Sequence, residues 1–111
     1  MKATIWHNPR CGTSRNALAL LDEAGADVTI VEYLRDPPSP DELKRVYARA
    51  GLTPRQGLRA KEPAAQDLAN ATDAEIIDAM MLNPVLIERP LVETEQGALL
   101  ARPAERVREI L

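Results

Sequence analysis

The only cysteine and the only histidine of this chain, Cys11 and His7, lie four residues apart near the start of the sequence. Cysteine attacks electrophiles as a thiolate, the form that a nearby positive charge favours. His7 could favour the thiolate as a cation or as a hydrogen-bond donor through a water. A solvated or structurally hydrogen-bonded histidine is the alternative, because spacing alone does not show contact.

The residues around Cys11 predict that it lies at a turn between a strand and a helix. Residues 3–7 (ATIWH) are typical of a short strand, and Asn8 followed by Pro9 marks a turn. From Thr13 onward the apolar residues follow helical spacing up to Gly25, which suits a C-terminal cap. Cys11 therefore lies at or just before a helix N-terminus, where free N–H groups and the helix dipole lower the pKa of a thiol.

The first turn of this helix also suits an oxyanion. Gly12 offers an unhindered backbone N–H, and Thr13 and Ser14 offer hydroxyl groups within one turn of the sulfur. Ser14 stands where a Cys-x-x-Cys motif has its second thiol, so an oxidised Cys11 must be resolved by a thiol of another molecule. A small, buried and inert Cys11 is the alternative.

The rest of the pattern predicts one domain over residues 1–111 with short elements separated by prolines. Ser39 and Thr72 each precede a glutamate by three residues, which is the spacing of a capping box. The expected elements after the first helix are a strand at 28–33, a helix at 40–50, weak helical structure within 53–69, a helix after Thr72 that ends at Asn83-Pro84, hairpin strands at 90–94 and 98–101, and a helix at 103–110. The order β-α-β, helical insertion, β-β-α predicts an α/β fold with a thioredoxin-like mixed sheet.

Composition excludes several classes of function. The net charge of −3 and the scattered basic residues argue against nucleic-acid binding. No apolar stretch reaches the roughly 20 residues that span a bilayer, and polar residues follow too soon for a signal peptide. A single cysteine forms no internal disulfide, which favours the reducing cytoplasm. No spaced set of metal ligands appears, so we expect no metal site and no bound cofactor.

Residues 7–15 (HNPRCGTSR) closely resemble the active-site segment of the glutaredoxin-coupled arsenate reductases. The similarity continues in order through almost the whole chain, at residues 33–34, 37–39, 57–59, 83–84, 87–90 and 101–103. The family has a thioredoxin-like fold with a helical insertion, in agreement with the element order. The chain ends at Leu111, before the longer C-terminal tail of the best-known members.

The resemblance implies a function and a set of site residues. Cys11 matches the nucleophile that forms a thiol–arsenate ester, and His7 matches the histidine thought to help keep the thiolate. Arg59, Arg89 and Arg102 match the three arginines that hold the oxyanion and its reduced product. Glutathione, a co-substrate, then attacks the adduct, glutaredoxin supplies the next reducing step, and arsenite leaves. We expect the protein to act as a monomer.

The chemistry of arginine agrees with these roles. Guanidinium groups stay protonated and present paired donors to tetrahedral oxyanions such as arsenate. Arg89 and Arg102 each precede a proline, which restricts their backbone to extended conformations. In a thioredoxin-like fold the loop before the hairpin faces the cysteine, which makes Pro90 a candidate cis-proline. Arg15 is placed to point toward the anion or to form a salt bridge on the helix surface.

Two alternatives to arsenate reduction stay open. One is a glutathione-dependent thiol reductase of the same family that acts on another substrate. The other is a regulator that senses thiol stress and binds RNA polymerase. Such regulators typically carry a Cys-x-x-Cys switch, and Ser14 in place of the second cysteine argues against this role.

Overall fold

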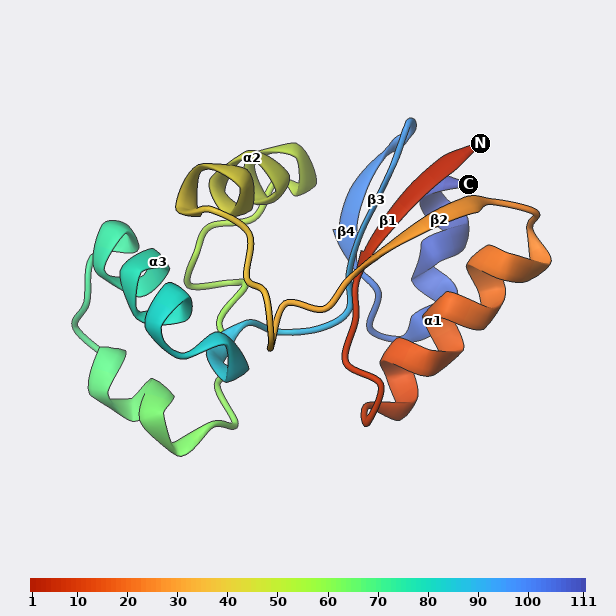
Figure 1. Ribbon diagram of the computed structural model, residues 1–111. Helices are drawn as coiled ribbons and strands as arrows, with labels where there is room; N and C mark the ends of the chain where they lie inside the picture. The colour runs from red at the N-terminus through yellow and green to blue at the C-terminus, as the bar shows by residue number, and fades with distance from the viewer.

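A computed structural model describes residues 1–111 and shows a four-stranded mixed sheet with helices on both faces (Figure 1). Strand β1 (Lys2–Trp6) pairs in parallel with β2 (Asp27–Val31) and antiparallel with β3 (Leu91–Thr94). Strand β4 (Gly97–Leu100) pairs antiparallel with β3, which gives the order β2-β1-β3-β4. This arrangement confirms the predicted mixed sheet of the thioredoxin-like plan.

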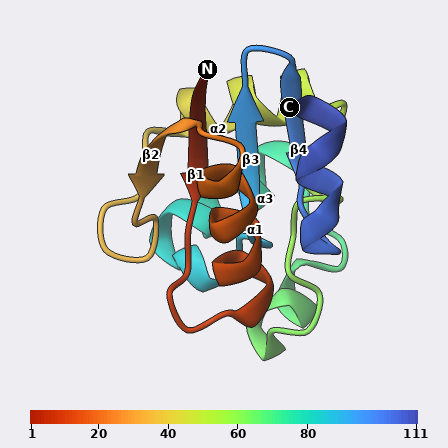
Figure 2. The same cartoon turned by 90° about the vertical axis from the view of Figure 1, so that its right-hand side faces the viewer.

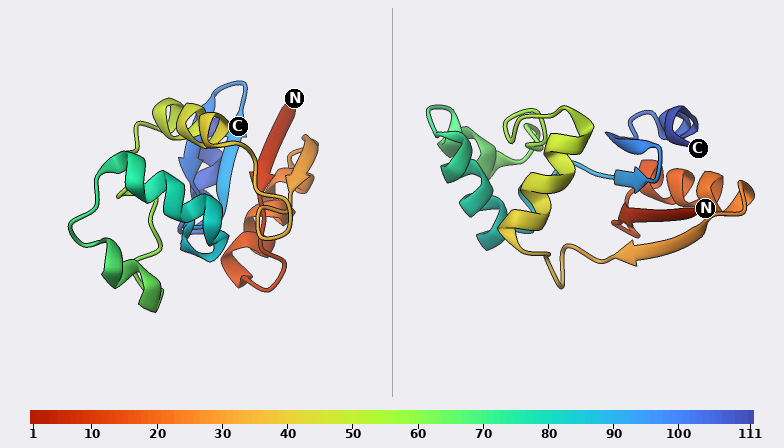
Figure 3. Two further views of the ribbon diagram at one scale, coloured as in Figure 1. Left: turned by 60° about the vertical axis from the view of Figure 1, so that its left-hand side comes forward. Right: turned by 90° about the horizontal axis from the view of Figure 1, so that it is seen from above.

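The helices divide between the two faces of the sheet (Figure 2). Helix α1 (Gly12–Glu23) and the C-terminal 3₁₀ helix η3 (Ala104–Ile110) cover one face. The insertion between β2 and β3 covers the other face and stands apart in the view from above (Figure 3). It contains α2 (Pro40–Ala50), η1 (Pro63–Leu68), α3 (Asp73–Leu82) and η2 (Pro84–Leu86). None of the helices has the length and apolar character needed to cross a membrane.

Helices α2 and α3 begin at the predicted caps. The Ser39 hydroxyl accepts a hydrogen bond from Glu42 N at 3.2 Å, and the Thr72 hydroxyl accepts one from Glu75 N at 3.2 Å. At Thr72 the capping box is complete, because the Glu75 carboxylate accepts from Thr72 N at 2.9 Å. At Ser39 only one half of the box forms, because the Glu42 carboxylate pairs with Arg45.

Two predicted elements differ from the structure. The second strand ends at Val31, before Tyr33, because the chain turns inward there and buries the Tyr33 side chain completely. The last helix is a 3₁₀ helix, in which residues three apart lie on one side. Its buried residues are Ala104, Val107 and Ile110, so the spacing of its apolar face fits three residues per turn better than 3.6.

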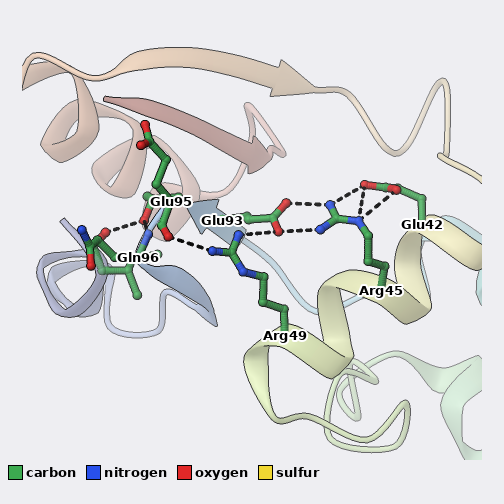
Figure 4. Close-up of polar contacts among 8 residues, drawn as sticks. Glu42, Arg45, Arg49, Glu93, Glu95 and Gln96 are labelled. Carbon is green, nitrogen blue, oxygen red and sulfur yellow. Dashed lines mark hydrogen bonds and ion pairs between the residues drawn. The ribbon is translucent and has the colours of Figure 1, made fainter.

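A network of ion pairs connects α2 with Glu93 of β3 (Figure 4). The Arg45 guanidinium lies 2.6 Å from the Glu42 carboxylate and 2.7 Å from the Glu93 carboxylate. Arg49 donates to Glu93 at 2.8 Å and to the Glu95 carbonyl at 2.9 Å. Hydrogen bonds from Arg45, together with those from Arg49, outweigh the effect of partial burial and lower the pKa of Glu93 to about 2.

A second connection joins two parts of the insertion. Leu58 and Ile87 form an isolated antiparallel bridge, and Glu88 N donates to Gly57 O at 2.9 Å. The Tyr47 hydroxyl donates to the same Gly57 carbonyl at 3.3 Å. Gly57 lies so close to the Tyr47 ring that an added Cβ would overlap the ring atoms. The segment before Arg59 is therefore fixed between the Tyr47 ring and the residues that lead into β3.

Replacement of Glu93 by Gln should lower stability in a pH-dependent way. The folded-state pKa of Glu93 lies below its usual value of 4.5, so the stabilisation is complete above pH 4.5 and is lost as the pH falls toward 2. After allowance for the solvent exposure of the two arginines, we expect a loss of about 1 kcal/mol at pH 7. Urea unfolding of both proteins at pH 7 and pH 3 measures the difference in their free energy of unfolding. This difference should be less than half as large at pH 3 as at pH 7.

Glu109→Gln is the matched control, because the Glu109–Arg106 pair is exposed and joins neighbouring turns of one short helix. It should change the unfolding midpoint very little at either pH. A Glu93→Gln protein as stable as the parent at pH 7 would contradict a stabilising role for the network.

Replacement of Gly57 by Ala should destabilise the protein, because the new methyl group and the Tyr47 ring cannot occupy the same space. Overpacking of this kind typically costs about 1–3 kcal/mol, which thermal unfolding will detect. Gly12→Ala is the stability control, since its nearest neighbour would be the Arg15 side chain at an ordinary 3.7 Å. Equal midpoints for the two variants would show that the Tyr47 ring moves aside freely.

Candidate active site

The pairing register of the sheet brings four chain segments to the same end of the strands. Trp6 lies opposite Val31 on one side and Leu91 on the other, and Leu91 lies opposite Leu100. The residues that follow β1, β2 and β4, and those that precede β3, therefore leave the sheet at the same end. The segments with Cys11, Arg89 and Arg102 all meet there.

The loop after β1 is held by its own hydrogen bonds. Cys11 is the N-cap of α1, and its N–H donates to Asn8 O at 3.0 Å. The Asn8 side chain accepts a hydrogen bond from Arg10 N at 2.9 Å, which helps to order the loop. Arg15 donates to the Pro9 carbonyl at 2.9 Å instead of forming a surface salt bridge. Cys11 thus has a defined position at the start of the helix.

The environment of the Cys11 sulfur favours the thiolate. Partial burial raises the pKa of the thiol, but hydrogen bonds from the Ser14 backbone N–H, Arg89 and Arg102 outweigh burial and leave the pKa below its ordinary value. The Nη1 atom of Arg102 lies 3.9 Å from the sulfur. The side chain is half-buried, so an incoming reactant still reaches it. This combination is typical of a reactive cysteine.

His7 reaches Cys11 only through Ser14. Its Nδ1 atom lies 2.6 Å from the Ser14 hydroxyl, which also accepts a hydrogen bond from Asn8 N at 3.1 Å. No hydrogen bond joins His7 to Cys11, and burial lowers the pKa of His7 despite the opposing charge of Glu32. A neutral His7 can accept a hydrogen bond from the Ser14 hydroxyl and so orient Ser14. The backbone N–H of Ser14 in turn donates to the sulfur.

Gly12 and Thr13 form the start of α1, next to the sulfur. The N–H groups of the first helical turn have no acceptor within the helix. The space beside Gly12 is open, since an added Cβ would meet only the Arg15 side chain. The predicted oxyanion-binding residues of this turn thus lie beside Cys11, together with Ser14.

Arg89 lies just before β3 and Arg102 just after β4, and the two residues contact each other. The Arg102 guanidinium donates to the Arg89 carbonyl at 3.0 Å, and Ala101 N donates to Pro90 O at 2.9 Å. The Arg89–Pro90 peptide bond is cis, as predicted for a thioredoxin-like fold. The Arg102–Pro103 bond is also cis, which sequence reasoning missed. Both guanidinium groups lower the pKa of the Cys11 thiol.

Arg59 lies in the insertion and is held by acidic residues. Its Nη1 atom donates to Glu88 Oε1 at 2.7 Å, and its Nε atom lies 3.5 Å from Glu62 Oε1 without forming a hydrogen bond. Glu88 Oε1 also accepts from Arg89 N at 3.2 Å, so it joins the two arginine-bearing segments. Sequence reasoning missed Glu88, although its position directly before Arg89 was a usable signal.

Taken together, the site has a nucleophile that favours the thiolate, open N–H groups at a helix start, and the guanidinium groups of Arg89 and Arg102. Such a site can hold a tetrahedral oxyanion while the sulfur attacks its central atom. No group of three or more histidine, cysteine or acidic side chains is placed to hold a metal ion.

Comparison with known proteins identifies the family. The model of the ArsC family matches residues 6–110. A Rhizobium meliloti protein named arsenate reductase is 48% identical, in an alignment that covers 100% of this chain and 82% of that protein. The arsenate reductase of Escherichia coli K12 is 45% identical, covering 97% and 79% of the two chains. A solved structure described as an arsenate reductase from Vibrio cholerae superposes with a TM-score of 0.93 and is 40% identical, covering 100% of this chain and 98% of that one. Because the match extends along almost the whole chain in both sequence and fold, this protein belongs to the ArsC family.

Proposed function

We propose that this protein reduces arsenate to arsenite with glutathione and glutaredoxin, through a covalent adduct on Cys11. The observation that carries the proposal is the Cys11 thiol, whose pKa is lowered beside Arg89 and Arg102 at a helix start. The names of the relatives support arsenate as the substrate. The resemblance of residues 7–15 to the glutaredoxin-coupled enzymes supports the choice of reductants.

In the first step the Cys11 sulfur attacks the arsenic atom of hydrogen arsenate. A sulfur–arsenic bond forms and one arsenic–oxygen bond breaks. The released oxygen leaves as water, so that thiol and hydrogen arsenate together give a thiol–arsenate ester and one water. No electron has been transferred to arsenic at this stage.

In the next steps two external thiols supply two electrons. Glutathione attacks the arsenic and its sulfur displaces a second oxygen as water. A glutaredoxin thiol then attacks the glutathione sulfur, the arsenic–sulfur bond breaks with its electron pair on arsenic, and a glutaredoxin–glutathione disulfide forms. Water finally releases arsenite and restores the Cys11 thiol. Ser14 favours this use of external thiols, because the chain has no second cysteine to form a disulfide.

The arginines have distinct tasks in this scheme. Arg89 and Arg102 hold the thiolate and the oxygens of the bound anion, because both lower the pKa of the thiol and Arg102 Nη1 lies 3.9 Å from the sulfur. Arg59 approaches from the insertion, where Glu88 keeps its guanidinium in place. The remaining donors of Arg59 then complete the anion site. No bound cofactor is needed, and we propose a cytoplasmic monomer that meets its reductants in solution.

Replacement of Cys11 by Ser should abolish arsenate reduction, because a serine hydroxyl is not ionised at neutral pH. The assay contains arsenate, glutathione, glutaredoxin, glutathione reductase and NADPH, and follows NADPH oxidation. Removal of glutaredoxin should also reduce the rate strongly. Arg89→Ala and Arg102→Ala should each raise the KM for arsenate about 10- to 100-fold, through loss of a charged hydrogen-bond donor.

Arg108→Ala is the matched control for the arginine variants, since it removes one positive charge from an exposed position on η3. Its arsenate kinetics should equal those of the parent protein. Substantial turnover by Cys11→Ser would contradict the covalent mechanism. Glutathionylation of Cys11 without any arsenate turnover would instead indicate a thiol reductase with another substrate.

The rate of Cys11 alkylation by iodoacetamide should rise with a midpoint clearly below pH 8.5, the approximate pKa of an ordinary thiol. Arg102→Ala should move this midpoint upward, because it removes a donor from the thiolate. Phosphate or arsenate should slow alkylation at pH 7 by occupying the space beside the sulfur. A midpoint at pH 8.5 or above, with no protection by either anion, would overturn the proposed chemistry.

A further inference from the structure

Tyr33 lies at the same edge of the sheet as the predicted site. It follows β2 by two residues, and the last residue of β2, Val31, is paired with Trp6 at the end of β1. The Tyr33 side chain is fully buried, and its ring belongs to the core cluster that contains Trp6, Ile87 and Leu91. Trp6 ends β1, which leads into the loop with Cys11, and Ile87 and Leu91 lie on either side of Arg89 in the sequence. Tyr33 is thereby fixed next to the site.

The Tyr33 hydroxyl has no hydrogen-bond partner in the structure. Only three buried side-chain nitrogen or oxygen atoms of the protein lack one: Tyr33 Oη, Arg59 Nε and Arg89 Nε. Two of these three belong to the predicted oxyanion-binding arginines. Buried polar atoms without partners are uncommon, and each one is unfavourable for folding. The charges of both arginines act on the Tyr33 hydroxyl, so the three atoms belong to one region of the protein.

The electrostatic surroundings of the hydroxyl connect it to the same site. Burial raises the pKa of Tyr33 to about 12, against the opposing effects of Arg89, Asn8 and Arg59. The Cys11 sulfur raises it further. The Asn8 side chain lies alongside but does not meet hydrogen-bond geometry with the hydroxyl. Tyr33 is therefore protonated at neutral pH and is available as a neutral donor.

We propose that the Tyr33 hydroxyl donates a hydrogen bond to an oxygen of the anion held at Cys11, as a neutral donor beside the arginines. The proposal rests on the proposed function of this site. The hydroxyl is closed to solvent, so the proposal requires a side chain at the site to move when the anion binds. We place this movement at the Arg89 guanidinium, whose charge already acts on Tyr33, because a turn toward the anion would give both Tyr33 Oη and Arg89 Nε a partner. A tetrahedral oxyanion has enough acceptor oxygens for both the charged and the neutral donors.

Tyr33→Phe tests this role, because it removes the hydroxyl and keeps the ring. The probe is inorganic phosphate, and the readout is its protection of Cys11 against iodoacetamide at pH 7. Loss of one neutral donor should weaken this protection about 3- to 10-fold. The KM for arsenate should rise by a similar factor. Alkylation without phosphate should keep its midpoint, since a neutral hydroxyl adds no charge at the sulfur.

Stability distinguishes this role from a structural one. Tyr33→Phe should leave the thermal unfolding midpoint unchanged or raise it, because the hydroxyl has no partner to lose. Tyr47→Phe is the matched comparison: it also removes the hydroxyl of a fully buried tyrosine, but that hydroxyl donates to Gly57 O. Tyr47→Phe should therefore lower the midpoint. The two variants should therefore differ in the sign of their change in unfolding midpoint. This difference distinguishes a hydroxyl without a partner in the fold from one that stabilises the fold.

The outcomes separate this inference from the proposed function. If phosphate and arsenate fail to protect Cys11 in the parent protein, the proposed anion site itself is wrong. If the parent is protected and Tyr33→Phe is protected equally well, Tyr33 is not a donor to the anion and only this inference falls. A Tyr33→Phe protein that loses stability together with protection would assign the hydroxyl a structural role and would also overturn the inference.

Discussion

The alignment of four strand ends at one edge of the sheet is the constraint on which the site depends. Because Val31, Trp6, Leu91 and Leu100 lie in one row, the segments beyond them must share the same small volume. A slip of one residue in any pairing would turn a buried side chain outward and move its loop away. The register is fixed by two hydrophobic cores, one on each face of the sheet. Burial in the cores therefore determines the geometry around the sulfur.

The electrostatics of the site follow from how its positive charges are held. Arg89 and Arg102 are kept together by a hydrogen bond to a backbone carbonyl, which leaves their full charge for the sulfur and an anion. The two carboxylates near these arginines, Glu88 and Glu62, both pair with Arg59, which forms no hydrogen bond with the sulfur. A thiolate or an oxyanion is the natural counter-charge for such an arrangement.

The helical insertion carries Arg59 and must be held against the sheet. The segment before Arg59 pairs with the residues that lead into β3. The charged network of Arg45, Arg49 and Glu93 ties α2 to β3 at the far end. These contacts connect the insertion with β3 and the residues before it at two places, through the segment before Arg59 and through α2.

Local features of the sequence were enough to predict most of the elements and the position of Cys11 at the start of a helix. Strand and helix periodicity, the caps at Ser39 and Thr72, and the turn at Asn8 all act between near neighbours in the chain. Family resemblance supplied Arg59, Arg89 and Arg102, which spacing alone does not distinguish from other arginines. The tertiary structure decided which residues of different segments meet: that His7 hydrogen-bonds with Ser14, that Glu88 pairs with Arg59, and that Tyr33 leaves its strand to bury its ring in the core. Such contacts depend on strand register and on packing between the two halves of the chain, and no short stretch of sequence contains that information.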